Sequence, residues 1–162
     1  MMLLWRLSGA RHAKVLDGGY GLLFDGRWNT VGHAVTYAST SPSLCVLEKL
    51  VHIEDPSLLP EMIMVTYVIP AHLGIDTIGL EELPGDWRRR EAWTQQKGDE
   101  WRELGANPLL RVPSAIVPLP ASPDVNFLIN HNHPAAAEIK ISRLESFVFD
   151  PRLLWVSHIT ME

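Results

Sequence analysis

The chain has 162 residues, the length of one domain, and a net charge of −5 at pH 7. Its composition, 46% apolar and 20% charged, is typical of a globular protein and excludes a wholly disordered chain. The acidic balance argues against direct nucleic-acid binding, and no apolar run approaches the ~20 residues needed to cross a bilayer. Because there is one cysteine, Cys45, and no signal-peptide pattern, we expect a cytoplasmic protein. We predict one domain over residues 1–162, with a core from about 3 to 155.

Alternating apolar residues and turn-forming neighbours predict several short strands. They are expected at residues 3–7, 34–38, 61–69, 114–119 and 126–129, with a long strand or hairpin at 138–150. The segment between residues 9 and 26 is rich in glycine and predicts turns.

Two segments have helical patterns. Ser41 followed by Pro42 is typical of a helix start, and that helix should run from residue 42 to 53. Residues 86–104 are predicted to be helical in part, with a break near Lys97 and Gly98. Since the helices interrupt the strands without alternating regularly, the pattern favours an α+β fold with small twisted sheets and peripheral helices.

Glu48 is a candidate functional residue, because it lies at the edge of the apolar face of the first predicted helix. A carboxylate there is partly removed from water unless another group pairs with it. Taken alone, the position favours a structural glutamate paired with Lys49, His52 or solvent.

The segment from Asp25 to Asn29 is a second candidate. A glycine before Arg27 allows the backbone to approach a ligand closely, and arginine binds phosphate with two parallel hydrogen bonds. A surface turn held in place by Trp28 explains the same residues at least as well.

Other polar residues point less clearly to chemistry. Ser114 lies where a strand is expected to begin, and a serine there usually forms a turn. No nearby histidine and aspartate suggest that it acts as a nucleophile. His131 and His133 could suggest zinc, but the three or four ligands of such a site are missing nearby, so hydrogen-bonded loop histidines are favoured.

Taken in order, these segments resemble the RES domain, the toxin half of a bacterial toxin–antitoxin family named for an arginine, a glutamate and a serine. The resemblance extends over residues 5 to 150. The matching stretches are residues 26–29, Gly32, 35–39, 43–52, 98–101, 112–115, 126–130 and 133–134.

The resemblance implies an ADP-ribosyltransferase-like fold and NAD as the substrate, with no metal. It places the three family residues at Arg27, Glu48 and Ser114. Arg6 and Tyr37 match further family positions, and Asn126 is counted with them among the residues that bind NAD. Arg27, Tyr37, Glu48 and Ser114 should therefore meet in one cleft.

The chemistry of NAD cleavage agrees with these residues. Breaking the nicotinamide–ribose bond passes through an oxocarbenium-like state, which the carboxylate of Glu48 would stabilise. Nicotinamide leaves from a cationic form, so no acid is required to protonate it. Arg27, with Arg6, would neutralise the pyrophosphate, Tyr37 would stack on the nicotinamide, and Ser114 would orient Glu48 or the ribose.

Three functions remain open at this point. The protein could transfer ADP-ribose to a host protein, pass it to water or phosphate, or act as a non-catalytic NAD- or protein-binding module. The implied partner is an Xre-type antitoxin that inserts a segment near Arg27 and covers the NAD site, and the complex could also contain a homo-oligomer. A second docking surface could lie at the tryptophans between Trp87 and Trp101, although core packing is the favoured role for most of them.

Overall fold

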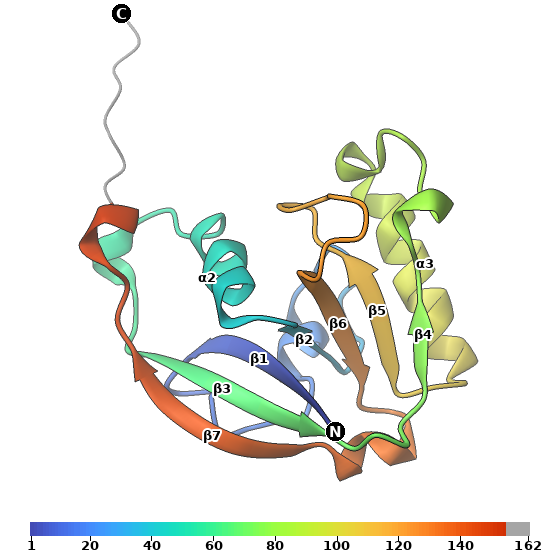
Figure 1. Cartoon of the computed structure of the whole chain (residues 1–162), viewed down its shortest axis with the longest axis horizontal. Helices are drawn as coiled ribbons and strands as arrows, with labels where there is room; N and C mark the ends of the chain where they lie inside the picture. Colours follow the sequence, from blue (N-terminus) through green and yellow to red (C-terminus); the bar gives the residue numbers. More distant parts are fainter. Residues whose placement is uncertain (155–162) are drawn as a thin grey trace, which may run out of the picture.

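The computed structural model describes residues 1–154, and these are built around one mixed sheet of seven strands. The strand order is β4-β5-β6-β2-β1-β3-β7, and only the β4–β5 pair is parallel. The strands are β1 (Met2–Gly9), β2 (Val35–Ser39), β3 (Met62–Ile69), β4 (Ile75–Thr77), β5 (Leu109–Pro113), β6 (Val125–Asn130) and β7 (Lys140–Phe147). Figure 1 shows the sheet as two groups of strands that diverge from one another.

The two groups are joined at a single residue pair. Strands β1, β3 and β7 pair along nearly their whole length, as do β5, β6 and β2. Between the groups, β1 and β2 share only the pair Trp5–Ser39. The small sheets expected from the sequence are therefore two parts of one continuous sheet, and the predicted α+β class is confirmed.

Three α-helices accompany the sheet within residues 1–154: α1 (Gly19–Leu23), α2 (Pro42–Leu50) and α3 (Glu91–Leu104). Figure 1 shows α2 next to the junction of the two strand groups, and α3 along β4 and β5. The side chain of Ser41 accepts a hydrogen bond from the Leu44 amide at 3.1 Å, so the predicted cap of α2 is confirmed.

Alternation along the strands sends neighbouring residues to opposite faces of the sheet and divides the core. One face carries a cluster that includes Leu4, Val65, Phe127 and Ile129. The other face has two clusters. One lies beside α3 (Trp28, Trp87, Trp101, Leu110, Val112 and Leu128), and the other lies beside α2 (Leu7, Cys45, Met62, Met64 and Phe149).

Trp87 and Trp101 are only 5% and 7% exposed. Both belong to the core cluster beside α3, so neither is available for the docking surface that was considered for the tryptophans of this region. Core packing, the alternative that the sequence favoured, is the role that the structure gives them.

Two predicted elements differ from the structure. Residues 114–119 do not form a strand, because the hydroxyl of Ser114 accepts the amides of Ile116 and Val117 and so closes a local turn. The strand instead lies just before this turn, as β5. Helix α3 also runs without a break through Gly98. The sequence did not predict α1 or β4.

Candidate active site

Glu48 lies at the end of the second turn of α2 and is hydrogen-bonded to two side chains that come from distant parts of the chain. Ser114 donates to Glu48 Oε1 at 2.9 Å, and Asn126 Nδ2 donates to the same oxygen at 2.7 Å. No described residue donates a hydrogen bond to the second oxygen, Oε2. One oxygen of the carboxylate is therefore held by two protein donors, and the other has none among residues 1–154.

The hydroxyl of Ser114 is committed to Glu48. Its oxygen already accepts the amides of Ile116 and Val117, at 3.0 and 3.2 Å, so its one proton is directed at the carboxylate. Ser114 is fully buried, at the end of β5. This arrangement suits a residue that orients Glu48 and does not suit a nucleophile.

Asn126 is oriented by a residue that the sequence did not single out. Ser39, on β2, donates to Asn126 Oδ1 at 2.6 Å. Because Oδ1 is occupied in this way, the amide nitrogen of Asn126 faces Glu48. Ser39 and Asn126 are directly opposite in the β2–β6 ladder, which no local sequence pattern reveals.

The Arg27 turn, which we define as residues 26–30, forms a second group of contacts. Gly26 and Asn29 form an isolated β-bridge, and the hydroxyl of Tyr37 joins the turn from β2. That hydroxyl accepts the amide of Trp28 at 2.9 Å and donates to Asn29 Oδ1 at 2.7 Å. Burial raises the pKa of Tyr37 well above its usual range, so its proton is retained for Asn29.

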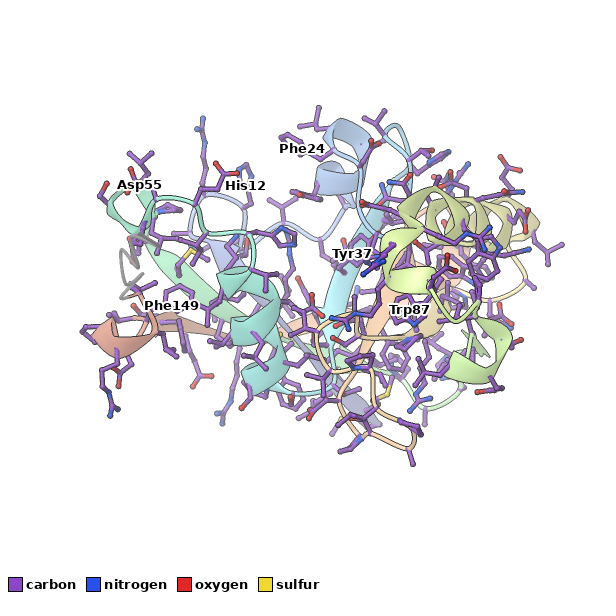
Figure 2. All side chains as sticks on the ribbon, turned by 90° about the horizontal axis from the view of Figure 1, so that it is seen from above. His12, Phe24, Tyr37, Asp55, Trp87 and Phe149 are labelled. Atoms are coloured by element: carbon purple, nitrogen blue, oxygen red, sulfur yellow. The ribbon has the colours of Figure 1, made fainter. Side chains whose placement is uncertain are left out.

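The guanidinium of Arg27 is supported by the segment before α3. It lies 5.7 Å from the centre of the Trp87 ring, and its Nη1 donates to the carbonyl of Arg88 at 3.3 Å. No acidic side chain within residues 1–154 forms an ion pair with it. In Figure 2, Tyr37 and Trp87 lie toward the α3 end of the molecule, and Asp55 and Phe149 lie toward the other end.

Strand β2 places the two groups of contacts next to each other. Tyr37, which holds the Arg27 turn, and Ser39, which orients Asn126, are two residues apart on this strand. Residues with that spacing point to the same face of a sheet, about 7 Å apart. No hydrogen bond within residues 1–154 joins Arg27 to Glu48 directly, and the shared face is what relates them.

Arg6 lies on β1, which meets β2 at the junction of the two strand groups. Burial lowers the pKa of Lys49 on α2, and the positive charge of Arg6 lowers it further. Neither residue forms an ion pair within the described part of the chain. The junction therefore has two basic side chains without an ion-pair partner among residues 1–154, although the protein as a whole is acidic.

Two hollows of the surface lie away from these residues. The first hollow has a volume of about 590 Å³, and its lining includes Arg102, Asn130 and His133. The second has a volume of about 490 Å³, and its lining includes Asp17 and His131. Neither is lined by Glu48 or Arg27. Among residues 1–154 no cluster of three or more histidine, cysteine, aspartate or glutamate side chains could hold a metal ion, and no helix in that range is long and apolar enough to span a membrane.

Comparison with known proteins identifies the family. The model of the RES domain matches residues 3–150. The chain is 35% identical over 156 residues to a protein of Photorhabdus laumondii named Toxin Res, with 94% of this chain and 97% of the relative covered. It is 37% identical over 157 residues to a Toxin Res of Pseudomonas putida, covering 94% of this chain and 99% of the relative.

A third similar protein carries a more specific name. The Prs ADP-ribosylating toxin of a Sphingobium strain is 34% identical over 159 residues, covering 93% of this chain and 95% of the relative. The fold is similar to that in the crystal structure of the M. tuberculosis MbcT–MbcA toxin–antitoxin complex, with a TM-score of 0.67 at 16% identity. That match covers 91% of this chain and 84% of the other, and at this identity it shows the fold alone.

These matches show that the protein is a small α+β domain of the RES type. The chain belongs to the RES domain family, as the resemblance in its sequence predicted.

Proposed function

We propose that the protein is a toxin of a toxin–antitoxin pair that binds NAD, cleaves its nicotinamide–ribose bond and transfers ADP-ribose to a protein acceptor. The observation that carries the proposal is the pair of hydrogen bonds to Glu48 Oε1, which leaves Oε2 without a donor among the described residues. Membership of the RES family and the similarity to an ADP-ribosylating toxin support the same conclusion.

Glu48 supplies the electrostatic part of the proposed reaction. As the bond between ribose C1′ and the nicotinamide nitrogen breaks, its electron pair leaves with nicotinamide and positive charge develops on the ribose. A carboxylate with a fixed orientation stabilises that charge without having to reorganise. The acceptor then forms a bond to C1′ and loses its proton, for which Glu48 Oε2 is a suitable base.

The basic residues supply the binding part. The guanidinium of Arg27 has no acidic partner within residues 1–154, and it can bind an oxygen pair of the pyrophosphate. Arg6 adds a second positive charge at the junction of the strand groups. Tyr37 would contact the nicotinamide through its ring, because its hydroxyl is already bonded to the Arg27 turn. The proposed site uses NAD from the cytoplasm and requires no metal.

The decisive experiment incubates the purified protein with NAD labelled in the adenylate moiety and with a bacterial lysate. Free nicotinamide and protein-bound label are measured in the same samples. We expect nicotinamide release together with a labelled protein band. Nicotinamide release without a labelled band would instead select transfer to water or phosphate. Absence of both would overturn the enzymatic proposal in favour of a binding module.

The proposal includes an antitoxin of the Xre type that covers the site around Arg27. A toxin that consumes NAD has to be kept inactive, and covering the NAD site does this directly. Arg27 is partly exposed, and its guanidinium forms no ion pair within residues 1–154, which suits an acidic or carboxylate-terminated segment of the partner.

The occlusion is tested by competition. Purified antitoxin should raise the apparent dissociation constant for NAD in proportion to its concentration. If NAD binds the toxin–antitoxin complex as tightly as it binds the free toxin, the antitoxin does not cover the site.

A further inference from the structure

One face of α3 holds the backbone of the Arg27 turn. Thr94 Oγ1 donates to the carbonyl oxygen of Arg27 at 2.6 Å, and Gln95 Nε2 donates to the carbonyl oxygen of Gly26 at 3.0 Å. Thr94 has no solvent exposure, and its hydroxyl also lies 2.9 Å from the carbonyl of Glu91. Because the hydroxyl has one proton, the shorter contact to Arg27 is its main bond.

The next turn of α3 holds the other end of the same segment. Asp99 accepts the amide of Thr30 at 3.2 Å and its hydroxyl at 2.7 Å. Gly98 lies against the backbone of Trp28, where a side chain would collide with the carbonyl oxygen. Residues 94, 95, 98 and 99 are spaced so that they share one side of a helix.

The two ends of Arg27 are thus held by one continuous segment of chain. Thr94 binds its backbone carbonyl, while Trp87 and Arg88 contact its guanidinium. Among residues 1–154, Thr94 provides the one side-chain donor to the Arg27 carbonyl, and Gln95 the one to the Gly26 carbonyl. If either donor is lost, the carbonyl it held is released on the Gly26–Arg27 side of the turn, while Trp28 remains anchored in the core.

We infer that Thr94 and Gln95 are positioning residues, which fix the backbone of Arg27 so that its guanidinium reaches the pyrophosphate of NAD. The inference rests on the proposed function, and it adds a part of the chain that the family resemblance did not assign to the site. Since the pyrophosphate does not react, misplacing Arg27 should weaken binding of NAD and its transition state equally. The Michaelis constant should rise and the turnover number should change little.

The test compares variants that differ in a single hydrogen bond. Thr94→Val has the same shape without the hydroxyl, and Thr94→Ser retains the hydroxyl without the methyl group. We expect Thr94→Val to raise KM for NAD about tenfold with kcat within about twofold of wild type, the scale of one lost hydrogen bond. Thr94→Ser should restore KM to near the wild-type value, whereas a packing role would make the serine variant at least as defective as the valine variant.

Gln95→Ala provides a second variant at a partly exposed position, in case Thr94→Val does not fold. Its matched control is Gln96→Ala, one residue along α3, where the amide bonds to Glu100 and not to the turn. Gln95→Ala should raise both KM for NAD and the dissociation constant of ADP-ribose, measured by calorimetry, and Gln96→Ala should change neither. Equal effects of the two alanine variants would overturn the inference.

The outcome for the wild-type protein separates this inference from the proposed function. If the wild-type protein neither releases nicotinamide nor binds ADP-ribose, the proposed function itself is wrong, and the inference is overturned with it. If the wild type is active while Thr94→Val and Gln95→Ala have wild-type KM values, the inference alone is wrong.

Discussion

At the scale of single residues, the orientation of Glu48 depends on donors from two different elements. Ser114 directly follows β5, and its hydroxyl also accepts two backbone amides, those of Ile116 and Val117. Asn126 lies on β6, and its Oδ1 accepts a hydrogen bond from Ser39. A side chain held in this way loses little further freedom when a ligand binds. The arrangement therefore suits a carboxylate that must keep its place as charge develops in a ligand.

Glu48→Gln tests whether the negative charge is required. The glutamine Oε1 can still accept from Ser114 and Asn126, so we expect the free energy of unfolding to change by less than about 1 kcal/mol. Loss of the charge should lower nicotinamide release at least about 100-fold. The measurements are product chromatography and urea denaturation, with the exposed Glu54→Gln as the control. Wild-type turnover in Glu48→Gln would contradict the proposed mechanism.

At the scale of elements, α3 shows why a glycine need not end a helix. The sequence predicted a break near Gly98, since glycine destabilises an exposed helix interior by about 1 kcal/mol relative to alanine. The helix continues because Gly98 lies against the carbonyl of Trp28, where any side chain would collide. The hydrogen bonds of Thr94, Gln95 and Asp99 to the Arg27 turn offset the weak helix propensity of Gly98.

Gly98→Ala should accordingly have the opposite effect to the one that helix propensity predicts. We expect the free energy of unfolding to fall by roughly 1 to 3 kcal/mol, the usual cost of overpacking, as Trp28 and α3 move apart. Chemical denaturation of Gly98→Ala, with Gln96→Ala as a measure of intrinsic helix propensity on α3, checks this. A Gly98→Ala protein that is as stable as wild type or more so would show that the Trp28 contact does not matter.

At the scale of the whole molecule, the sheet is two strand groups joined at Trp5–Ser39, with polar and charged groups near that junction. His131 follows β6, and its Nε2 lies 2.8 Å from the hydroxyl of Thr36 on β2. The pKa of His131 is lowered to about 4, mainly by burial; the charge of Asp17 opposes this shift and that of Arg6 adds to it. His131 is thus neutral in the folded protein at neutral pH.

This shift predicts how stability depends on pH. Between the folded pKa of about 4 and the ordinary value of about 6.5, the unfolded chain binds more protons at this residue, so stability falls as the pH falls. Because some water reaches His131 and screens its charge, we expect the shift to remove roughly 1 to 2 kcal/mol between pH 7 and pH 5. His131→Gln, which cannot titrate, should lose correspondingly less stability in urea denaturation over this range. Equal losses in both proteins would rule out His131 as the cause.

The sequence alone determined the features that depend on neighbouring residues. Alternating apolar residues identified most of the strands, including β1, β3 and β6, and Ser41 with Pro42 identified the start of α2. The order of motifs identified the family, whose model matches residues 3–150.

The tertiary structure alone decided how these residues meet. Ser114 and Asn126 are 66 and 78 positions from Glu48, yet both donate to the same oxygen. The roles of Ser39, Thr94 and Gln95 could not be predicted, because serine, threonine and glutamine are ordinary in strands and helices. Their partners are set by strand pairing and by the packing of α3 against the Arg27 turn. Such contacts join residues far apart in the chain, and no periodicity within a segment encodes them.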